Sequence, residues 1–501
     1  MLRRTTLAAT AIVTAALLAL TACSGSAVAP TPAGSPDADG AVTVRLVLEP
    51  TNLDIRQTSG SALDQVLIDN VYQGLVARTP TQEIVPALAS DWTVSDDALT
   101  YTFTLREGVT FHDGQALTPQ DVVSSLTQHR DNAGWVDSGR LAEVTGIAAD
   151  GQKIVLTLAK PDSQLLWNLS GRAGIVLKEG DTVDYQTKAN GTGPFTLKNW
   201  TQGSSITLSR FEGYWGNPAT SAEVVFDYIP DPQAALSAAQ AGEVDVLTGF
   251  DPNMTSQVEA NGSFTVVTGQ STDKGTLAFN QTTGPLADKR VRQAIRQAID
   301  HNAIVQAIGA GQTLYGPIPS LDPGYEDLSS VAPYDPDAAK ALLAQAGAEN
   351  LTLTLTIPSF YTTTIPTLLV SDLDKVGITL QVKSVDFATW LQDVYVNKDY
   401  QLSFVLHTEA RDFENWANPD YYFTYDNPEV QALYQKARTA TSDDDAADAL
   451  SQAARIVSED AAADWIYQGA TVLAVATNVS GMPSTNVNER LNVTELGKSN
   501  G

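Results

Sequence analysis

Cys23 is the only cysteine of the 501-residue chain, and its position favours the attachment of a lipid over an ordinary secretion signal or a transmembrane anchor. It follows the sequence Leu-Thr-Ala, an apolar run at residues 7–20 and a pair of arginines at positions 3 and 4. A signal peptidase requires such a positive start, apolar segment and small residues before the cut. The run is also short for a membrane span of roughly 20 residues. We therefore expect residues 1–22 to be a bacterial lipoprotein signal peptide and Cys23 the lipidated N-terminus.

Lipidation of Cys23 has consequences for the rest of the chain. It leaves no thiol for a disulfide or for cysteine catalysis. Residues 23–40 are rich in Ser, Ala, Pro and Gly, a composition that cannot form a core and favours a flexible linker. We expect folded structure to begin near Ala41.

Other residue patterns that carry chemistry are weak. The chain has neither a His-Glu-x-x-His zinc motif nor a Gly-x-Ser-x-Gly nucleophile elbow, and the loop Gly191-Thr192-Gly193-Pro194 lacks the Lys-Ser or Lys-Thr of a phosphate cradle. We expect no metal, no cofactor and no enzyme activity. The Asp and Glu pairs are too numerous for the sequence to exclude a carboxylate hydrolase, yet nothing singles one pair out. The four histidines are scattered and do not form a ligand motif: His112, His129, His301 and His407.

The charge balance restricts the possible partners. The chain has 30 Lys and Arg against 58 Asp and Glu, a formal net charge of −28. Nucleic acid and anionic lipid would be repelled, so neither is expected as a partner. With 43% hydrophobic residues, the chain can form a large core, and its length suggests two to three domains.

Strands and helices alternate along the chain, which predicts a mixed α/β fold. Thr118 with Pro119 and Asp121 reads as a capped helix start, and Gly242 and Gly347 read as helix stops. Period-two alternation predicts strands at residues 42–46, 101–105, 154–158 and 351–357.

Several segments follow one another in an order that resembles a known family, the family 5 extracellular solute-binding proteins, which are peptide and nickel binders of ABC importers. The resemblance extends over nearly the whole chain beyond the linker. The segments that carry it are Asn52-Leu53-Asp54, residues 71–76, Arg106-Glu107-Gly108-Val109, Phe111-His112-Asp113-Gly114, Gly191-Thr192-Gly193-Pro194-Phe195, residues 210–216, Ala241-Gly242-Glu243-Val244-Asp245 and residues 288–294.

The resemblance implies a periplasmic-binding-protein-like α/β fold (cluster C, type II), with two main lobes joined by a hinge and an extra domain. Ligand would be held between the lobes as they close. The implied divisions are lobe I at residues 41–82, 191–275 and 470–501, the extra domain (lobe II) at 83–190, and lobe III at 276–469. Such a protein is expected to be a lipid-anchored monomer on the extracytoplasmic face of the cell membrane that delivers peptides to ABC permease subunits.

The ligand site is implied by the same resemblance. Peptide-binding relatives carry an aspartate that pairs with the ligand's α-ammonium group, and Asp412 matches it. The neighbourhood departs from the family pattern, because Arg411 stands beside Asp412 and the usual Gly-Trp is missing. Arg411 could instead form a plain ion pair with Asp412.

A second hypothesis assumes the same fold with a different ligand: an oligosaccharide, a nickel chelate or another small polar solute. Trp416, Tyr421 and Tyr422 could stack on a sugar ring, whereas Trp390 is expected to pack its own helix. Tyr214 and Trp215 are expected to be packing residues, and Asp113 and His112 to be structural residues of a turn. Import and peptide signalling would use the same cleft, and the sequence leaves both open.

Overall fold

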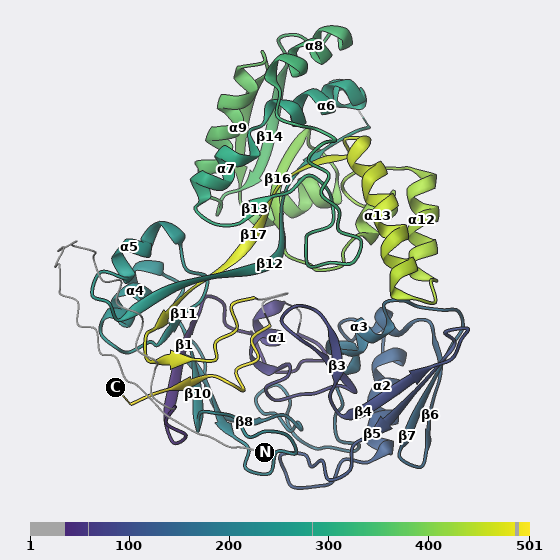
Figure 1. Ribbon diagram of the computed structural model, residues 1–501, viewed down its shortest axis with the longest axis vertical. Helices are drawn as coiled ribbons and strands as arrows, with labels where there is room; N and C mark the ends of the chain where they lie inside the picture. The colour runs from purple at the N-terminus through teal and green to yellow at the C-terminus, as the bar shows by residue number, and fades with distance from the viewer. Residues whose placement is uncertain (1–35, 59, 283, 486–489, 501) are drawn as a thin grey trace, which may run out of the picture.

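The computed structural model describes residues 36–58, 60–282, 284–485 and 490–500. The predicted signal peptide, Cys23 and most of the predicted linker lie outside these residues. The chain forms an upper and a lower half, which two long strands join (Figure 1). We define the upper half as residues 280–462 and the lower half as the described residues before 264 and after 476. In the described part of the chain, no helix is both long and apolar enough to cross a membrane.

The two connecting strands are β12 (Phe264–Phe279) and β17 (Ala463–Ala476), and they pair antiparallel. They are central members of one 11-stranded sheet that continues into both halves, in the order β15-β14-β16-β12-β17-β11-β1-β10-β9-β8, with β13 paired to β17. The other strands of this sheet are β1 (Ala41–Leu46), β8 (Phe195–Thr201), β9 (Ser205–Arg210), β10 (Glu223–Tyr228), β11 (Val246–Leu247), β13 (Gln312–Thr313), β14 (Thr352–Pro358), β15 (Thr379–Val385) and β16 (Leu402–His407).

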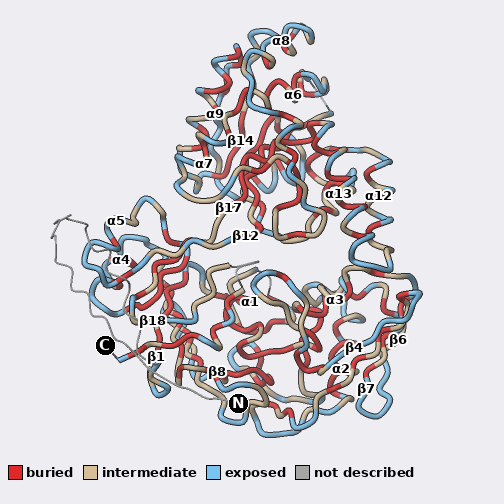
Figure 2. The backbone as a smooth tube through the Cα atoms, viewed as in Figure 1, coloured by how far each residue is buried: buried red, intermediate tan, exposed pale blue. Residues whose placement is uncertain are grey.

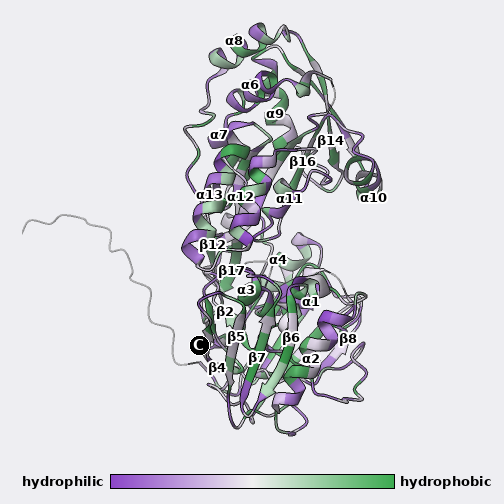
Figure 3. Cartoon of the chain, turned by 90° about the vertical axis from the view of Figure 1, so that its right-hand side faces the viewer, coloured by the Kyte–Doolittle hydropathy of each residue, from purple (hydrophilic) through white to green (hydrophobic). Residues whose placement is uncertain are grey.

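The lower half contains a second, separate sheet. It has four strands in the order β4-β5-β7-β6 and packs against α2 (Figures 1 and 3). The short hairpin of β2 and β3 lies next to it in sequence. The bounds are β2 (Val76–Arg78), β3 (Ile84–Pro86), β4 (Ala89–Val94), β5 (Thr100–Leu105), β6 (Val144–Asp150), β7 (Lys153–Leu158), β18 (Val479–Ser480), β19 (Gly497–Lys498), α1 (Ser61–Leu67), α2 (Pro119–Asp131), α3 (Leu165–Leu169), α4 (Pro232–Gln240) and α5 (Thr255–Val258).

Helices surround the sheet of the upper half (Figure 1). A π-helical segment, η5 (Leu391–Val396), continues directly from α10. The helices are α6 (Lys289–Ala298), α7 (His301–Ile308), α8 (Pro336–Ala346), α9 (Thr364–Asp374), α10 (Phe387–Trp390), α11 (Glu414–Ala417), α12 (Pro428–Arg438) and α13 (Asp443–Glu459).

Buried residues gather in four clusters, two in each half (Figure 2). One lower cluster surrounds β1 and β10, and the other fills the space between the four-stranded sheet and α2. In the upper half, one cluster lies between the sheet and α6 to α9, and the other is rich in aromatic residues and packs under α12 and α13. Each half therefore has its own hydrophobic cores.

The local elements predicted from the sequence are confirmed. The four predicted strands correspond to β1, β5, β7 and β14. At the start of α2, the Thr118 side chain accepts a hydrogen bond from the Asp121 amide while the Asp121 carboxylate accepts one from the Thr118 amide, which is a complete capping box. Gly242 and Gly347 follow their helices with φ of 78° and 64°, the left-handed conformation that glycine adopts without strain.

Candidate ligand-binding cleft

A cavity of about 450 Å³ lies where the two halves meet β12 and β17. A pocket of this size can hold a small ligand. Because both halves and the connecting strands form its wall, a change in the angle between the halves would change its shape. Its described lining includes Val47, Leu48, Gln65, residues 248–250 and Pro252 from the lower half, Ile308, Ala310 and Leu406 from the upper half, and Ser271, Asp273, Tyr467 and residues 469–473 from the connecting strands.

Asp273 is the only charged residue among the described residues that line this cavity. It lies where the β12–β17 register shifts between Gln270 and Lys274, so this part of β12 leaves the regular ladder. The Asp273 amide donates to Ser271 Oγ at 3.1 Å. Burial raises the pKa of Tyr467, and the Asp273 charge raises it further. The cavity is therefore lined by apolar groups, neutral polar groups and one acid.

Lys274, the next residue, is buried on the opposite side of the strand. Its side chain is 2% exposed, and its Nζ lies 3.2 Å from Asp412 Oδ1. It also donates to the backbone oxygens of Glu409 at 2.8 Å and Thr272 at 3.3 Å. The sequence analysis offered Arg411 as an ion-pair partner of Asp412, and this is wrong, because the partner is Lys274. The distant Lys274 is brought to Asp412 by the pairing of β12 with β16.

Arg411 points away from Asp412. Its backbone adopts φ of 55°, and its amide donates to Asp322 Oδ2 at 2.6 Å. Its guanidinium lies over the ring of Trp167, 4.1 Å from the centroid. Burial raises the pKa of Asp322 to about 6, against the opposing effect of Lys274. Arg411 therefore connects the upper half to α3 of the lower half.

Asp412 and Asp322 share a small cavity, which is separate from the one between the halves. Its volume is about 20 Å³, room for about one water molecule. The Asp412 side chain is 10% exposed. The body of a ligand does not fit this cavity, and the charge of Asp412 is already compensated by Lys274.

Two of the three aromatic residues proposed for sugar stacking are in the core. Trp416 is 2% exposed and stacks on Phe423 with 4.0 Å between ring centroids. Tyr422 is 1% exposed, and its hydroxyl lies 2.8 Å from His407 Nε2. This corrects the prediction for both residues, because neither ring has a face open to a ligand. Tyr421 is partly buried and packs edge-on against Tyr395, with centroids 5.7 Å apart.

His407, Glu409 and Asp412 lie close enough to hold a metal, with ligand atoms within 4.8 Å of one another. The Lys274 ammonium occupies this neighbourhood and repels a cation. Burial and the Lys274 charge lower the pKa of His407 to about 4, so the imidazole is neutral near pH 7. The cluster is better explained as a set of groups around the buried Lys274 than as a metal site.

An exposed, mostly aromatic surface of the upper half was missed by the sequence analysis. We call Phe360, Phe387, Leu391 and Tyr395 the aromatic surface; their exposed fractions lie between 39% and 63%. Phe387 and Leu391 belong to α10 and η5, where their spacing resembles a buried helix face and gives no signal of exposure. Trp390 on the same segment is buried as predicted and donates to Ser403 Oγ at 2.9 Å.

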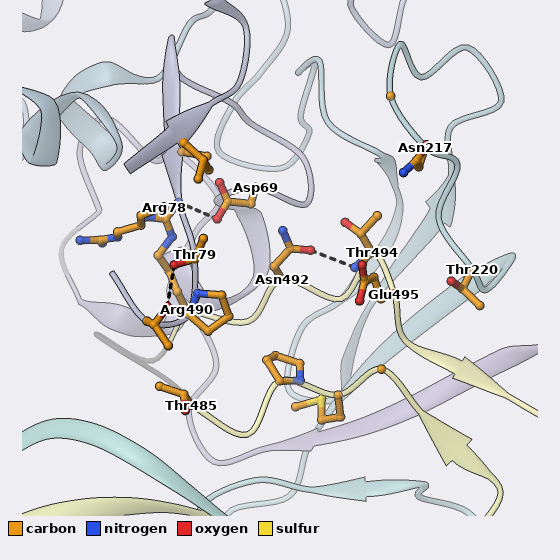
Figure 4. A pocket seen from close by; sticks show the side chains of 18 of the residues that line it. Asp69, Arg78, Thr79, Asn217, Thr220, Thr485, Arg490, Asn492, Thr494 and Glu495 are labelled. Carbon is orange, nitrogen blue, oxygen red and sulfur yellow. Dashed lines mark hydrogen bonds and ion pairs between the residues drawn. The ribbon is translucent and has the colours of Figure 1, made fainter. Parts of the chain in front are cut away.

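The larger cavity, of about 1200 Å³, lies within the lower half (Figure 4). Its wall includes Arg78 and Asp69, and Arg490 pairs with Asp69 at 2.6 Å. Its described lining comes from residues 69–85, 214–220 and 481–495 and includes no residue of the upper half. Movement of the halves cannot enclose a ligand there, so we favour the smaller cavity as the binding cleft.

Tyr214 and Trp215 line that larger cavity, and both bond to Gln73. The Gln73 amide donates to the Tyr214 hydroxyl at 3.1 Å, and Trp215 Nε1 donates to the Gln73 side-chain oxygen at 3.0 Å. His112 accepts from the Gly191 amide at 3.2 Å, and Asp113 pairs with Lys178 at 2.5 Å. The contacts of His112 and Asp113 agree with the predicted structural roles in a turn, whereas Tyr214 and Trp215 line the cavity and their packing role stays a prediction.

Comparison with known proteins identifies the family to which the sequence is similar. The model of the bacterial extracellular solute-binding proteins, family 5, matches residues 83–452. Among curated proteins, the dipeptide-binding protein of Escherichia coli (strain K12) is 30% identical over 324 residues, covering 58% of this chain and 60% of that protein. Heme-binding protein A of Haemophilus influenzae is 30% identical over 331 residues, covering 60% and 59%. The matches therefore span about three fifths of these relatives.

Solved structures match over more of the chain. The periplasmic binding protein DppA of Helicobacter pylori in complex with the peptide STSA has a TM-score of 0.76 at 23% identity, covering 92% of this chain and 98% of that chain. NikA of Brucella suis in complex with Fe(III)-EDTA has a TM-score of 0.82 at 19% identity, covering 92% and 100%. At these identities the likeness shows the fold alone, and the two ligands differ in chemistry.

Proposed function

We propose that this chain, which belongs to family 5 of the bacterial extracellular solute-binding proteins, captures peptides between its two halves and delivers them to the permease of an ABC importer. The observation that carries the proposal is the cavity of about 450 Å³ whose wall is shared by both halves and by β12 and β17. Such a site closes and opens with the angle between the halves, as capture and release require. The family consists of binding proteins, and the proposed role includes no chemical step.

The halves also meet outside the cleft, at contacts that can define a closed arrangement. Arg438 of the upper half pairs with Asp162 of the lower half at 2.9 Å, and the Ser163 amide donates to the Arg438 oxygen at 3.0 Å. Together with Arg411 over Trp167, these contacts lie at α3 and α12. We propose that residues 41–82, 191–275 and 470–501 form lobe I, 83–190 lobe II and 276–469 lobe III.

Peptides are the first candidate because the dipeptide-binding relative and the peptide complex of DppA share this fold. The alternative cargo is an oligosaccharide, a nickel chelate or another small polar solute, and a protein complexed with Fe(III)-EDTA shares the fold as well. The buried positions of Trp416 and Tyr422 disfavour sugar stacking at those rings.

We assign Asp412 an indirect role in binding. Its carboxylate holds Lys274 and thereby fixes the strand that carries Asp273 into the cleft. A direct grip on a ligand ammonium would leave Lys274 buried without a counter-ion, which is strongly unfavourable. Arg411 is proposed to act at the contact between the halves. Tyr421 is proposed to act in the packing of the upper half.

We further propose that Cys23 anchors a monomer to the extracytoplasmic face of the cell membrane. The apolar run and small residues before Cys23 support this. Expression of Cys23→Ser in a bacterial host tests it: the variant should stay unprocessed and incorporate no labelled palmitate, whereas labelling equal to the parent would contradict the anchor.

Native mass spectrometry of protein that begins at Ala41, purified without denaturation, tests the cargo. Bound masses that fragment into peptides would support the proposal, and their spread would show how long a peptide the cleft accepts. A single non-peptide mass would replace peptides by the alternative cargo. Protein without any bound mass is then titrated with a dipeptide and tripeptide mixture, and absence of retained peptides would contradict the proposal.

A further inference from the structure

We propose, building on the proposed function of the cleft, that its ligand is a short peptide whose backbone amide bonds to the side chain of Gln65 and whose side chains are uncharged and apolar. This assigns Gln65 as a ligand-binding residue, and Val47 and Leu48 as the residues that select an apolar side chain. Peptides with acidic or basic side chains are the expected poor ligands.

Gln65 lines the cavity between the halves with a side-chain amide that has no partner among the described residues. The residue is 7% exposed and belongs to α1, which lies at the edge of the lower half that faces the upper half (Figures 1 and 3). Within the described part of the chain its side chain makes no hydrogen bond, and neither its nitrogen nor its oxygen is sealed inside the protein. The amide is therefore left to the cavity, where a ligand can bond to it.

The chemistry of this amide matches a peptide bond. A glutamine side chain donates from its nitrogen and accepts at its oxygen, and a peptide unit offers the complementary carbonyl oxygen and N–H group. Both groups are neutral, so the contact recognises the backbone of a ligand and is independent of the charge on its side chains.

The fold holds Gln65 in place through the other faces of α1. Asp64, the residue before it, pairs with the buried Arg172 at 2.6 Å. Leu63 and Val66 belong to the hydrophobic cluster around β1 and β10. A group that is fixed before binding loses little conformational entropy when a ligand arrives, so Gln65 is a preorganised contact.

Apolar side chains line the cavity from both halves. Val47 and Leu48 follow β1 directly and are 38% and 56% exposed. Ile308 and Leu406 line the same cavity from the upper half. Gly249 leaves room for Val47, because a Cβ added at Gly249 would lie 2.9 Å from Val47 Cγ2. A ligand with an apolar side chain would remove these groups from water, which is favourable.

The described lining of the cavity offers no free charge to a ligand side chain. It includes no Lys, Arg or His. Asp273, its one acidic residue, has an interaction within the chain and is not left for a ligand. A charged side chain would therefore lose its hydration without gaining a counter-ion. The charged ends of a peptide avoid this cost, because the wall at Leu48 is open to solvent.

The volume of the cavity limits the length of the ligand. At about 450 Å³, it lies toward the lower end of the range of small-molecule pockets, which is about 300 to 1,000 Å³. The ligand class is therefore that of dipeptides and tripeptides with apolar side chains.

The test is calorimetric titration of the protein starting at Ala41 with matched tripeptides. Ala-Leu-Ala should bind most tightly, Ala-Gln-Ala several-fold more weakly, and Ala-Lys-Ala and Ala-Glu-Ala least. Val47→Ser combined with Leu48→Ser should weaken Ala-Leu-Ala about tenfold and leave Ala-Gln-Ala nearly unchanged. Gln65→Leu should weaken all of these peptides by a similar factor of about five to ten and keep their order.

Matched controls separate these effects from general ones. Gln120→Leu makes the same change at an exposed position of α2, and Val94→Ser removes an apolar side chain that is 41% exposed on β4, outside the cavity. Neither should change the affinity for any of the tripeptides. Gln65→Asn, which shortens the side chain and withdraws the amide, is the second variant in case Gln65→Leu does not fold. Equal affinities for Ala-Leu-Ala and Ala-Lys-Ala would overturn the apolar class, and an unchanged affinity in the Gln65 variants would overturn the backbone contact.

A pair of capped probes separates this inference from the peptide proposal. N-acetylleucinamide has an apolar side chain, amide groups and no charged end, and N-acetyllysinamide differs from it by a charged side chain; each is added at millimolar concentration in a thermal-shift assay. If no tripeptide binds but N-acetylleucinamide alone raises the Tm, and Gln65→Leu abolishes the shift, peptides are wrong and a neutral apolar amide stands as the ligand class. Tripeptides that bind without the expected order would leave the peptide proposal standing and contradict the ligand class. Equal shifts with both probes, or none, together with no bound tripeptide, would contradict both.

Discussion

The guanidinium of Arg411 lies 4.1 Å from the ring centroid of Trp167, and Arg78 lies 3.7 Å from the same ring. Arg411 belongs to the upper half, whereas Trp167 and Arg78 belong to the lower half. One indole therefore receives a cation from each half. Because β12 and β17 are the described strands that join the halves, such contacts set which angle between them is preferred.

Weakening a second contact between the halves, the pair of Asp162 and Arg438, should favour a more open protein. Asp162→Asn removes the charge that pairs with Arg438 and should raise the radius of gyration in small-angle scattering without ligand. A partly buried pair of this kind contributes about 1 kcal/mol, so a several-fold change in population is expected. Glu326→Gln is the control, because it removes a pair with Arg455 inside the upper half. An equal radius of gyration in the parent, Asp162→Asn and Glu326→Gln would argue against a role for Asp162 in closure.

Asp412 should be more important for stability than for direct ligand contact. Asp412→Asn leaves Lys274 buried without its counter-ion, which should lower the free energy of unfolding by about 3 to 5 kcal/mol in urea denaturation. The double variant Lys274→Met with Asp412→Asn should recover most of the loss, because no buried charge is left unpaired. A single variant as stable as the parent would show that Lys274 finds another partner.

Asp322 should make stability depend on pH in an unusual direction. Its pKa is raised to about 6 by burial, so the folded protein binds a proton that the unfolded chain releases above about pH 4. This contribution destabilises the protein above pH 6 and is relieved as the pH falls toward 4. Asp322→Asn should therefore be more stable than the parent at pH 7, by on the order of 2 to 3 kcal/mol.

The advantage of Asp322→Asn over the parent should shrink to near zero at pH 4. His407 and His112, with pKa values lowered to about 4 by burial, act in the opposite sense, because they favour the folded protein above pH 6.5 and lose that effect as the pH falls. Taking the difference between variant and parent cancels them. A difference that is constant from pH 4 to 7, measured by urea unfolding, would contradict the raised pKa.

Gly191 should not tolerate even a methyl group. An added Cβ would lie 1.9 Å from the Val71 backbone oxygen, and backbone cannot move aside cheaply. Gly191→Ala should lower the free energy of unfolding by about 3 kcal/mol or more. Gly139→Ala is the matched control, since nothing lies within 4 Å of its added Cβ. Equal stability of the two variants would mean that the Gly191 loop relaxes.

The sequence predicted the elements better than the site, for a physical reason. Strand alternation and the capping box at Thr118 depend on neighbours within a few positions, which a single sequence displays. The Lys274–Asp412 pair depends on which strands lie side by side, and the aspartate that faces the cleft depends on a register shift in β12. Arg411 was misassigned because its left-handed backbone turns the side chain toward Trp167.

The sequence also could not predict which aromatic residues are buried and which are exposed. Phe423 and Tyr422 resemble Phe360 and Phe387 in type, but only tertiary packing decides which rings are covered. Trp416, proposed to stack on a sugar ring, lies in the short helix α11 and contributes to the core. The type of an aromatic residue therefore predicts how much surface it can bury, but not which residues it packs against.

The path of the chain through the lower half also sets an order of folding. The upper half is one continuous segment between β12 and β17, so it can form from neighbours in sequence. The lower half cannot, because the Asn70 side chain donates to the Leu491 oxygen and accepts from the Val493 amide, 421 and 423 positions away. Loops of such length close slowly. Refolding should therefore show an early phase in which the upper half folds. In a later phase, the C-terminal segment from residue 490 docks and the lower half completes its core.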